Sequence, residues 1–419
     1  MPNWATDLPD KKYLRLFISD EGWKVYSDKM SPDGERPEAS GAKRLIESAF
    51  LNALNATNLI LMTGSGSSFA AKNAAGKPQP AGMVAVWNAV KQAVGEEHFS
   101  KICGFFPNAP INENIEKLLT LCKLYLELNQ TSQSEDKKEV NKFVEDAEKA
   151  ILDTVDFIDS ETDLNSHATV IQKIGRRGIR KPRARFFTTN YDLCFEEAAR
   201  RHRFTIIDGF SHALEQTYDR SHFDFDIVRR EQGKDAPDYI ESVFHLYKLH
   251  GSIDWRRLDG EIIRSKGPKG DPILIYPRSS KYQESFEAPY LDMIGALQAS
   301  LREPDTALII SGFGFNDDHL SRPILSAMET NMSMRLIICD PAFLGAADLE
   351  ADVHVVDPEL ATDNRYLSAF HKLARGGDPR IHLMNGRFSD MAEALPDLVG
   401  ETDRERHVAR VRSLLDPET

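Results

Sequence analysis

The chain of 419 residues has only four cysteines, and none of them forms a Cys-x-x-Cys pair. That spacing supplies neither a zinc ribbon nor a disulfide framework, so the cysteines are expected to be buried apolar residues. Apolar runs are also short, far below the roughly 20 residues that a membrane-spanning helix needs. The first residues lack the basic and apolar regions of a signal peptide, and the cytoplasm is the expected location.

An excess of positive charge is absent as well. The 65 acidic residues outnumber the 52 lysines and arginines, for a formal net charge of −13. Such a balance favours solubility and argues against general coating of nucleic acid. What the chain does contain, 41% hydrophobic and 28% charged residues, is typical of a folded protein. Its length allows one large domain or two ordinary ones, each with a substantial core.

Short continuous apolar runs recur along the chain and predict buried strands. Leu59–Met62 is the first such run, and Arg185–Phe187 leads into a polar segment. Further runs occur at 204–207, 243–249, 273–276, 307–310, 336–339 and 353–356. Helical patterns separate several of them, notably at 290–301 and 319–331. The alternation predicts an α/β fold with a Rossmann-like, mostly parallel sheet and helices on both faces.

The residues between the first two strands have a different pattern. Apolar stripes at helical spacing indicate a helical insertion, or small subdomain, that interrupts the sheet. The charged residues 404–415 predict a helix near the end of the chain. The expected division is an N-terminal segment with a loop (1–41), a Rossmann-like domain in two parts (42–82 and 179–390), a helical insertion (83–178) and a charged helical tail (391–419).

Unusual residues follow the predicted strands, at the carboxyl edge where open α/β sheets bind ligands. The first strand ends in Gly64–Ser68, whose glycines would let the backbone approach a pyrophosphate. A Gly-x-Gly sequence also occurs in ordinary turns. The third glycine and the downstream acid of the dinucleotide fingerprint are absent, so an ordinary hydride-transfer dehydrogenase is disfavoured.

Three more strand ends carry polar groups. Thr188–Asp192 brings a hydroxyl, a carboxamide and a carboxylate, although Asn and Asp also end strands as turn formers. His250 would lie at the sheet edge before a glycine, where the alternative is a satisfied core or capping histidine. Gly312–Asp317 is a Gly-x-Gly turn suited to ribose or phosphate. Asp340 follows a further strand and would accept from sugar hydroxyls or simply end the strand.

Taken in order, these segments resemble the sirtuin family, in particular the bacterial sirtuin-like NAD hydrolases of defence against phage. The resemblance covers roughly residues 42–360 and lies in the ordered set of motifs. It implies that Asn190 orders the ribose and a water, that His250 is the general base, and that Asp192 holds the nicotinamide carboxamide. The other implied NAD-binding residues are Gly64, Ser65, Gly66 and Ser68 at the pyrophosphate and Gly312, Phe313, Gly314 and Asp340 at the adenosine half.

The chain departs from the deacylases of that family in three respects. Thr189 stands where they usually have Gln, and Phe69–Asn73 replaces their Pro-Asp-Phe-Arg run. The zinc cysteines, whose module helps to shape the acyl-lysine channel, are missing. The prediction is therefore an enzyme without zinc that hydrolyses NAD to nicotinamide and ADP-ribose. A protein deacylase and a non-catalytic sensor of NAD or ADP-ribose are the alternatives.

Partners are expected at two kinds of surface. A basic stretch precedes the second strand and indicates a solvated loop or an oligomer contact, with DNA contact as the alternative. A constitutive NAD hydrolase would be toxic, so the insertion and the tail are expected to serve a homo-oligomer or an activating partner. The resemblance implies a HerA-type hexameric ATPase, and no membrane association is expected. The basic residues are Lys173, Arg176, Arg177, Arg180, Lys181, Arg183 and Arg185.

Overall fold

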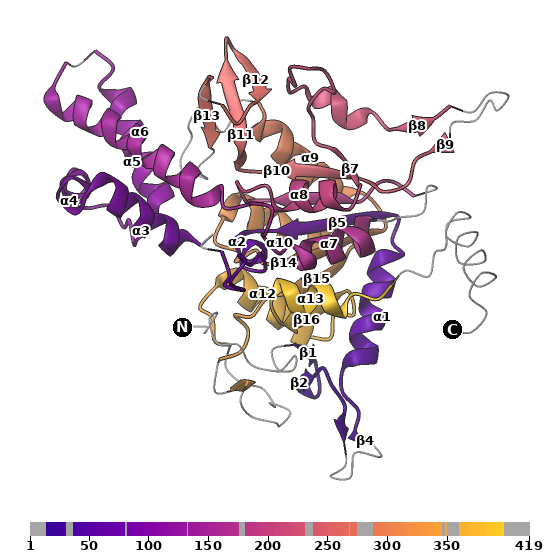
Figure 1. The fold of residues 1–419 in the computed structure, drawn as a ribbon. Coiled ribbons are helices and arrows are strands. Elements are labelled where there is room, and N and C mark those ends of the chain that lie inside the picture. Colours follow the sequence, from indigo (N-terminus) through magenta and orange to yellow (C-terminus); the bar gives the residue numbers. More distant parts are fainter. Residues whose placement is uncertain are drawn as a thin grey trace.

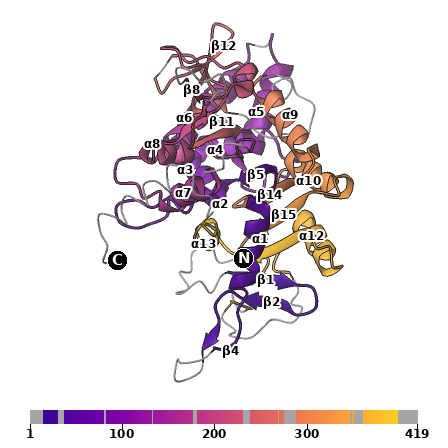
Figure 2. The same cartoon turned by 90° about the vertical axis from the view of Figure 1, so that its right-hand side faces the viewer.

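The computed structural model describes residues 14–30, 37–79, 82–131, 133–175, 181–230, 238–267, 269–274, 288–345, 348–349 and 360–397. Within these ranges a nine-stranded sheet runs through the molecule, and helices pack on both of its faces (Figure 1, Figure 2). The strand order is β2-β1-β16-β15-β14-β5-β6-β10-β7.

Seven consecutive strands of this sheet are parallel to one another. Their side chains are mostly buried, as in β14, because helices cover both faces and leave no solvated side. The predicted mostly parallel α/β sheet is therefore confirmed. The seven strands are β16 (Ile381–Asn385), β15 (Arg335–Cys339), β14 (Thr306–Ser311), β5 (Asn58–Thr63), β6 (Arg185–Thr188), β10 (Val243–Lys248) and β7 (Thr205–Ile207).

The order of the strands matches that of dinucleotide-binding sheets. From β5 the chain moves outward to β6 and β10, then returns to the other side of β5 for β14, β15 and β16. This is the 3-2-1-4-5-6 order of the Rossmann fold, with β7 added outside β10. The order reverses between β5 and β14, so the crevice in which such sheets bind ligands lies at their carboxyl ends.

Each face of the sheet has its own core. Successive strand residues point to opposite faces, so Leu61 and Ile309 lie in one core while Ile60 and Leu308 lie in the other. The first core contains side chains of α1 (Lys43–Leu54), α8 (Cys194–Arg201) and α13 (Phe388–Ala394). The second contains side chains of α9 (Tyr290–Arg302), α10 (Asp318–Thr330) and α12 (Arg365–Arg375).

The described part of the N-terminal segment contains strands, and most of the expected loop, at 32–37, lies outside the described residues. β1 (Arg15–Ile18) pairs antiparallel with β16, and β2 (Gly22–Val25) pairs antiparallel with β1, so both extend the main sheet. Trp23 is fully buried and packs against Phe343. A short ribbon of β3 (Lys29–Met30) and β4 (Pro37–Ala39) follows.

Four helices between β5 and β6 form the insertion, which projects from one side of the sheet in Figure 1. They are α3 (Met83–Val94), α4 (Glu96–Gly104), α5 (Ile115–Leu128) and α6 (Glu135–Val155), and they share a separate core. The next segment, α7 (Asn165–Val170) with the π-helix Ile171–Gly175, packs instead against the main domain. The insertion thus ends earlier than expected, because the apolar residues after Leu164 face the sheet.

A small antiparallel sheet follows β10, in the order β12 (Glu261–Arg264), β11 (Gly251–Leu258) and β13 (Asp271–Leu274). The described part of the expected strand at 273–276 belongs to this sheet. β8 (Val228–Arg229) and β9 (Asp238–Tyr239) form a separate ribbon, and a 3-10 helix spans Arg220–Asp224. The expected strand at 353–356 and helix at 404–415 lie outside the described residues. No helix within the described ranges is long and apolar enough to cross a membrane.

Candidate active site

Five neighbouring strands bring the predicted site residues to one edge of the sheet. Asp340 follows β15, Gly312 follows β14, Gly64 follows β5 and Asn190 comes two residues after β6. His250 comes two residues after β10. Because these strands are parallel and adjacent, all five residues lie at their carboxyl ends, around the point where the strand order reverses.

The glycines at the ends of β5 and β14 pack backbone against backbone. The Gly66 N–H, in the short helix α2 (Ser65–Ser68), donates to the Gly312 carbonyl at 2.9 Å. A Cβ on Gly66 would come within 2.6 Å of Gly312 Cα, and one on Gly312 within 2.5 Å of Ser67 N. Gly312 also has a φ of +74°. This crossing requires glycine at both places, and it keeps the switch point free of intervening side chains.

The Asn190 carboxamide is held by two serines of α2. Its Nδ2 donates to Ser67 Oγ at 3.0 Å and to Ser68 Oγ at 2.7 Å. Asn190 itself is only 8% exposed. Both N–H donors are therefore used, and Oδ1 has no hydrogen-bond partner among the residues that the structure describes. The remaining oxygen is an acceptor of fixed orientation that can position a water or a hydroxyl.

Asp192 is bound on both of its carboxylate oxygens. Ser68 Oγ donates to Oδ2 at 2.5 Å, and the Cys194 N–H at the start of α8 donates to Oδ1 at 2.9 Å. Asp192 thus links α2 to α8 through the β6 turn. A carboxylate has further lone pairs, and the role of Asp192 in holding nicotinamide stays a prediction.

A buried lysine, which the sequence analysis did not select, fixes this turn. Lys248 at the end of β10 is 2% exposed, and its Nζ donates to the Asp192 carbonyl at 2.5 Å and the Tyr191 carbonyl at 3.2 Å. It also forms an ion pair with Glu196 at 2.9 Å. Burial raises the pKa of Glu196, and the nearby ammonium opposes that shift. The sequence feature that could have indicated this role is a lysine at the end of an otherwise largely apolar strand.

His250 forms a pair with a carboxylate. Its Nε2 lies 3.2 Å from Asp317 Oδ2, and both side chains are largely buried. The other Asp317 oxygen accepts from the His319 N–H, which caps α10. When Nε2–H donates to Asp317, the lone pair of neutral His250 lies on Nδ1. No described residue hydrogen-bonds to Nδ1, so the imidazole can accept a proton there.

The ends of β14 and β15 are built differently. Phe313 and Phe315 are buried in the core, with ring centroids 5.1 Å apart. Asp340 is 2% exposed and accepts from the Ala342 N–H at 2.8 Å. Burial raises the pKa of Asp340 to about 6. Of the other predicted residues here, Ser65 and Gly314 are exposed.

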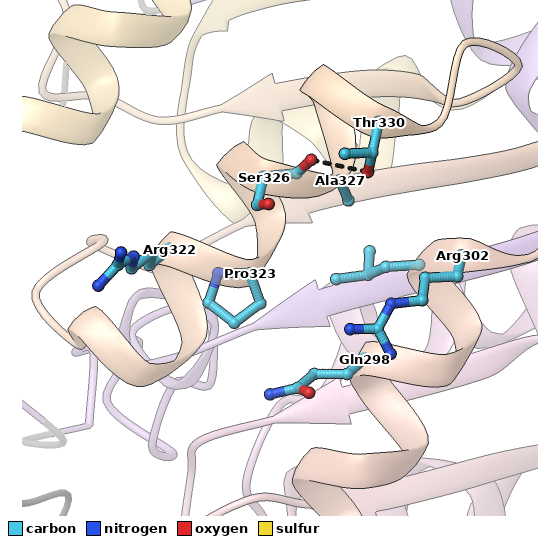
Figure 3. A pocket seen from close by; sticks show the side chains of 8 residues that line it. Gln298, Arg302, Arg322, Pro323, Ser326, Ala327 and Thr330 are labelled. Atoms are coloured by element: carbon cyan, nitrogen blue, oxygen red, sulfur yellow. Dashed lines mark hydrogen bonds between the residues drawn. The ribbon is translucent and has the colours of Figure 1, made fainter.

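A groove of about 220 Å³ lies between α9 and α10, as Figure 3 shows. Arg302 and Arg322 flank it from the two helices. None of the predicted site residues lines this groove. Its lining residues are Gln298, Leu301, Arg302, Arg322, Pro323, Ser326, Ala327 and Thr330.

Four residues of the basic stretch make contacts within the chain. The other three, Arg176, Arg177 and Arg180, lie outside the described residues. These contacts favour a structural role for the four, because their donors already have acceptors. The contacts are Lys173 Nζ to the Leu395 carbonyl at 2.5 Å, Lys181 Nζ to the Asn55 carbonyl at 2.6 Å, Arg183 to Asp226 at 2.9 Å and Arg185 to Glu303 at 2.7 Å.

The strand order and the site define a Rossmann-like α/β protein whose predicted site residues lie at the switch point of the sheet. Within that class, residues 184–349 match a family model described as the SIR2-like domain. This segment is less than half of the chain, and it contains Asn190, Asp192 and His250. The similarity supports a sirtuin-like relationship and indicates an NAD-utilising enzyme.

Comparisons with curated proteins and with solved structures were also made for the whole chain. No curated protein matches the chain. A solved structure reported under "Structural Basis for the Mechanism and Regulation of Sir2 Enzymes" aligns at 12% sequence identity. The TM-score is 0.35, and the alignment covers 88% of this chain and 98% of that one. Among the described residues no group of three or more His, Cys, Asp or Glu is placed to hold a metal ion.

Proposed function

We propose that the protein is an NAD+ hydrolase that cleaves the nicotinamide–ribose bond to give nicotinamide and ADP-ribose. The observation that carries the proposal is the arrangement of Asn190 and His250 at adjacent strand ends. Each is oriented by a buried partner, and each keeps one acceptor atom without a partner among the described residues. An oriented acceptor and a base are what hydrolysis by water needs.

The chemistry asks little of the protein. Nicotinamide leaves as a neutral molecule from a cationic nucleotide, and the ribose becomes oxocarbenium-like. The site must then position the reactants, stabilise charge and take one proton from the attacking water. Asn190 Oδ1 would orient that water or a ribose hydroxyl. His250 Nδ1 would take the proton, and Asp317 would stabilise the resulting imidazolium.

In this proposal the residues at the other strand ends would hold the rest of the substrate. The pyrophosphate would lie at the switch point, next to the place where the backbones of Gly66 and Gly312 pack against each other. Gly64, Ser65, Gly66 and Ser68 would hold the pyrophosphate, although Gly66 N–H and Ser68 Oγ also have donor roles inside the protein. The adenosine half would lie against Gly312, Phe313, Gly314 and Asp340.

The test is nicotinamide and ADP-ribose release from NAD by the purified chain, measured by chromatography. We expect Asn190→Ala to lose turnover by at least about a hundredfold while the far-UV spectrum is kept and unfolding stays cooperative. Ser326→Ala, in the groove between α9 and α10, is the matched control and should keep full activity. Full NAD cleavage by Asn190→Ala would overturn the proposal.

Experiments on the same purified protein distinguish NAD hydrolysis from two alternative functions. A deacylase would consume NAD only when an acylated peptide is added, and would transfer the acyl group. A non-catalytic sensor would bind NAD or ADP-ribose in calorimetry without releasing nicotinamide. The SIR2-like match alone fits both, so peptide dependence is the deciding measurement.

We further propose a cytoplasmic, NAD-depleting role in defence against phage, as a homo-oligomer working with a HerA-type ATPase. The sequence resemblance is the support for this setting. The pairing of Lys173, Lys181, Arg183 and Arg185 within the chain weighs against DNA contact through those four. Co-purification with the candidate ATPase, and the mass of the complex in solution, test the partner and the stoichiometry.

A further inference from the structure

The side chain of Tyr191 connects the catalytic turn to the helical insertion. Its hydroxyl donates to Glu116 Oε1 at 3.0 Å, and Glu116 is the second residue of α5. The Tyr191 side chain also packs against the core of the insertion, beside Leu193. Because Tyr191 lies between Asn190 and Asp192, a contact with its side chain acts directly on the turn that carries the proposed catalytic amide.

The main chain of Tyr191 is held from the opposite side. Its carbonyl accepts from Lys248 Nζ at 3.2 Å, from Ile253 N at 3.1 Å and from Ser252 Oγ at 3.4 Å. The ends of β10 and β11 thus fix the backbone. Glu116 fixes the direction of the Tyr191 side chain. Tyr191 is therefore held by the insertion through its side chain and by the main domain and small sheet through its backbone.

Glu116 also lies in the electrostatic surroundings of the proposed base. Burial raises the pKa of Glu116, His250 favours its charged form, and Asp317 opposes that form. The rings of Tyr191 and His250 have centroids 6.4 Å apart. The Glu116 carboxyl of the insertion therefore lies within electrostatic range of the His250–Asp317 pair.

A second polar contact joins the insertion to the small sheet, away from the site. Lys266 Nζ lies 3.2 Å from Asp156 Oδ1 just beyond the end of α6, and both side chains are about half exposed. Exposed ion pairs of this kind contribute little to stability. The insertion thus makes a partly buried polar contact with the catalytic turn and an exposed one with the small sheet.

We propose that Glu116 is a positioning residue, which holds Tyr191 and hence the Asn190 turn, so that the helical insertion controls turnover. This inference rests on the proposed NAD hydrolysis. Displacement of α5, by oligomerisation or by a bound partner, would release Tyr191 and change the rate without touching substrate.

The experiment compares Tyr191→Phe, Glu116→Leu and Glu116→Gln in steady-state nicotinamide release. Loss of the hydrogen bond should lower kcat about tenfold in the first two, with little change in KM. The Tyr191→Phe/Glu116→Leu double variant should be no slower than either single variant, because both remove one interaction. Glu116→Gln keeps an acceptor and should stay near the wild-type rate, as should the control Lys266→Met.

Two results would overturn the inference. One is a Glu116→Gln protein as slow as Glu116→Leu, which would mean that the negative charge matters and the acceptor does not. The other is additive losses in the double variant.

The contact between Tyr191 and Glu116 can also be tested if the protein turns out not to hydrolyse NAD. If the wild-type chain releases no nicotinamide, a double-mutant cycle on urea unfolding and hydrogen exchange of residues 189–193 still tests the contact between Tyr191 and Glu116. A non-zero coupling with faster exchange in both single variants supports a positioning role for Glu116, and no coupling rejects it.

Discussion

The two halves of the carboxyl edge of the sheet are built from different chemistry. At the ends of β6 and β10, two separate polar groups, Asn190 with its serines and His250 with Asp317, leave acceptors on Asn190 and His250. At β14 and β15, Phe313 is packed into the core and Asp340 is buried against a backbone donor. In the proposed mechanism the first half moves a proton and the second holds the ligand. Substitutions in the two halves should therefore separate rate from binding.

The largest expected effect is on the β10 side. His250→Ala should lower kcat about a thousandfold, because it removes the proposed proton acceptor. Asp317→Asn should lower kcat less, since the imidazole remains and loses only its orienting carboxylate. Single-turnover nicotinamide release measures both effects. A His250→Ala protein with an unchanged kcat and a raised KM would erase the distinction between the two halves.

Lys248→Met tests what holds the β6 turn. Removing one partner of a buried ion pair takes the lysine donor away from Glu196 and from the Asp192 carbonyl, and should reduce the free energy of unfolding by about 3–5 kcal/mol. Lys266→Met, in the exposed pair, should change it by less than about 1 kcal/mol. Urea unfolding gives both values. Equal losses of stability in the two variants would show that Lys248 does not stabilise the β6 turn.

Asp340→Asn tests the other half and should be stabilising. Folding raises the pKa of Asp340 from 3.8 to about 6, so the folded chain binds this proton more tightly than the unfolded chain does. The stability that this proton binding contributes is present below pH 3.8 and is lost as the pH rises through 6. At pH 7.5 the variant should therefore gain about 2–3 kcal/mol, falling to about 1 kcal/mol at pH 4.5.

The same variant should bind NAD more weakly, because an amide accepts from sugar hydroxyls less well than a carboxylate. We expect a raised KM with kcat nearly unchanged. Unfolding at the two pH values and the steady-state constants check the two effects independently. A variant that is destabilised at pH 7.5, or that loses kcat instead of affinity, would contradict the assignment of Asp340 to ligand holding.

The sequence predicted the central strands because strands covered on both faces appear as short, continuous apolar runs. Leu59–Met62 lies within β5, and the run Arg185–Phe187 lies within β6. It did not predict β1 and β2, which are four residues each. The apolar run in β1 is only Leu16–Ile18, and pairing with the distant β16 decides the structure.

The candidate site was likewise predictable only in part. Asn190, Asp192 and His250 stood out because a polar group just after an apolar strand is visible locally. Ser67, Lys248, Glu116 and Asp317 were not selected. Their partners in the site lie between 52 and 123 positions away, as in Lys248 to Glu196 and Ser67 to Asn190. No local pattern reports a contact made across such a separation.

By itself the amino-acid sequence determined which segments become buried strands and which polar groups follow them, because burial and periodicity depend on neighbouring residues. The tertiary structure decided which of those groups meet: that Gly66 crosses Gly312, that Asn190 turns its amide toward two serines, and that His250 has Asp317 behind it. The reason is physical. Hydrogen bonds and close contacts act over a few ångströms in space, and only folding makes distant parts of the chain neighbours.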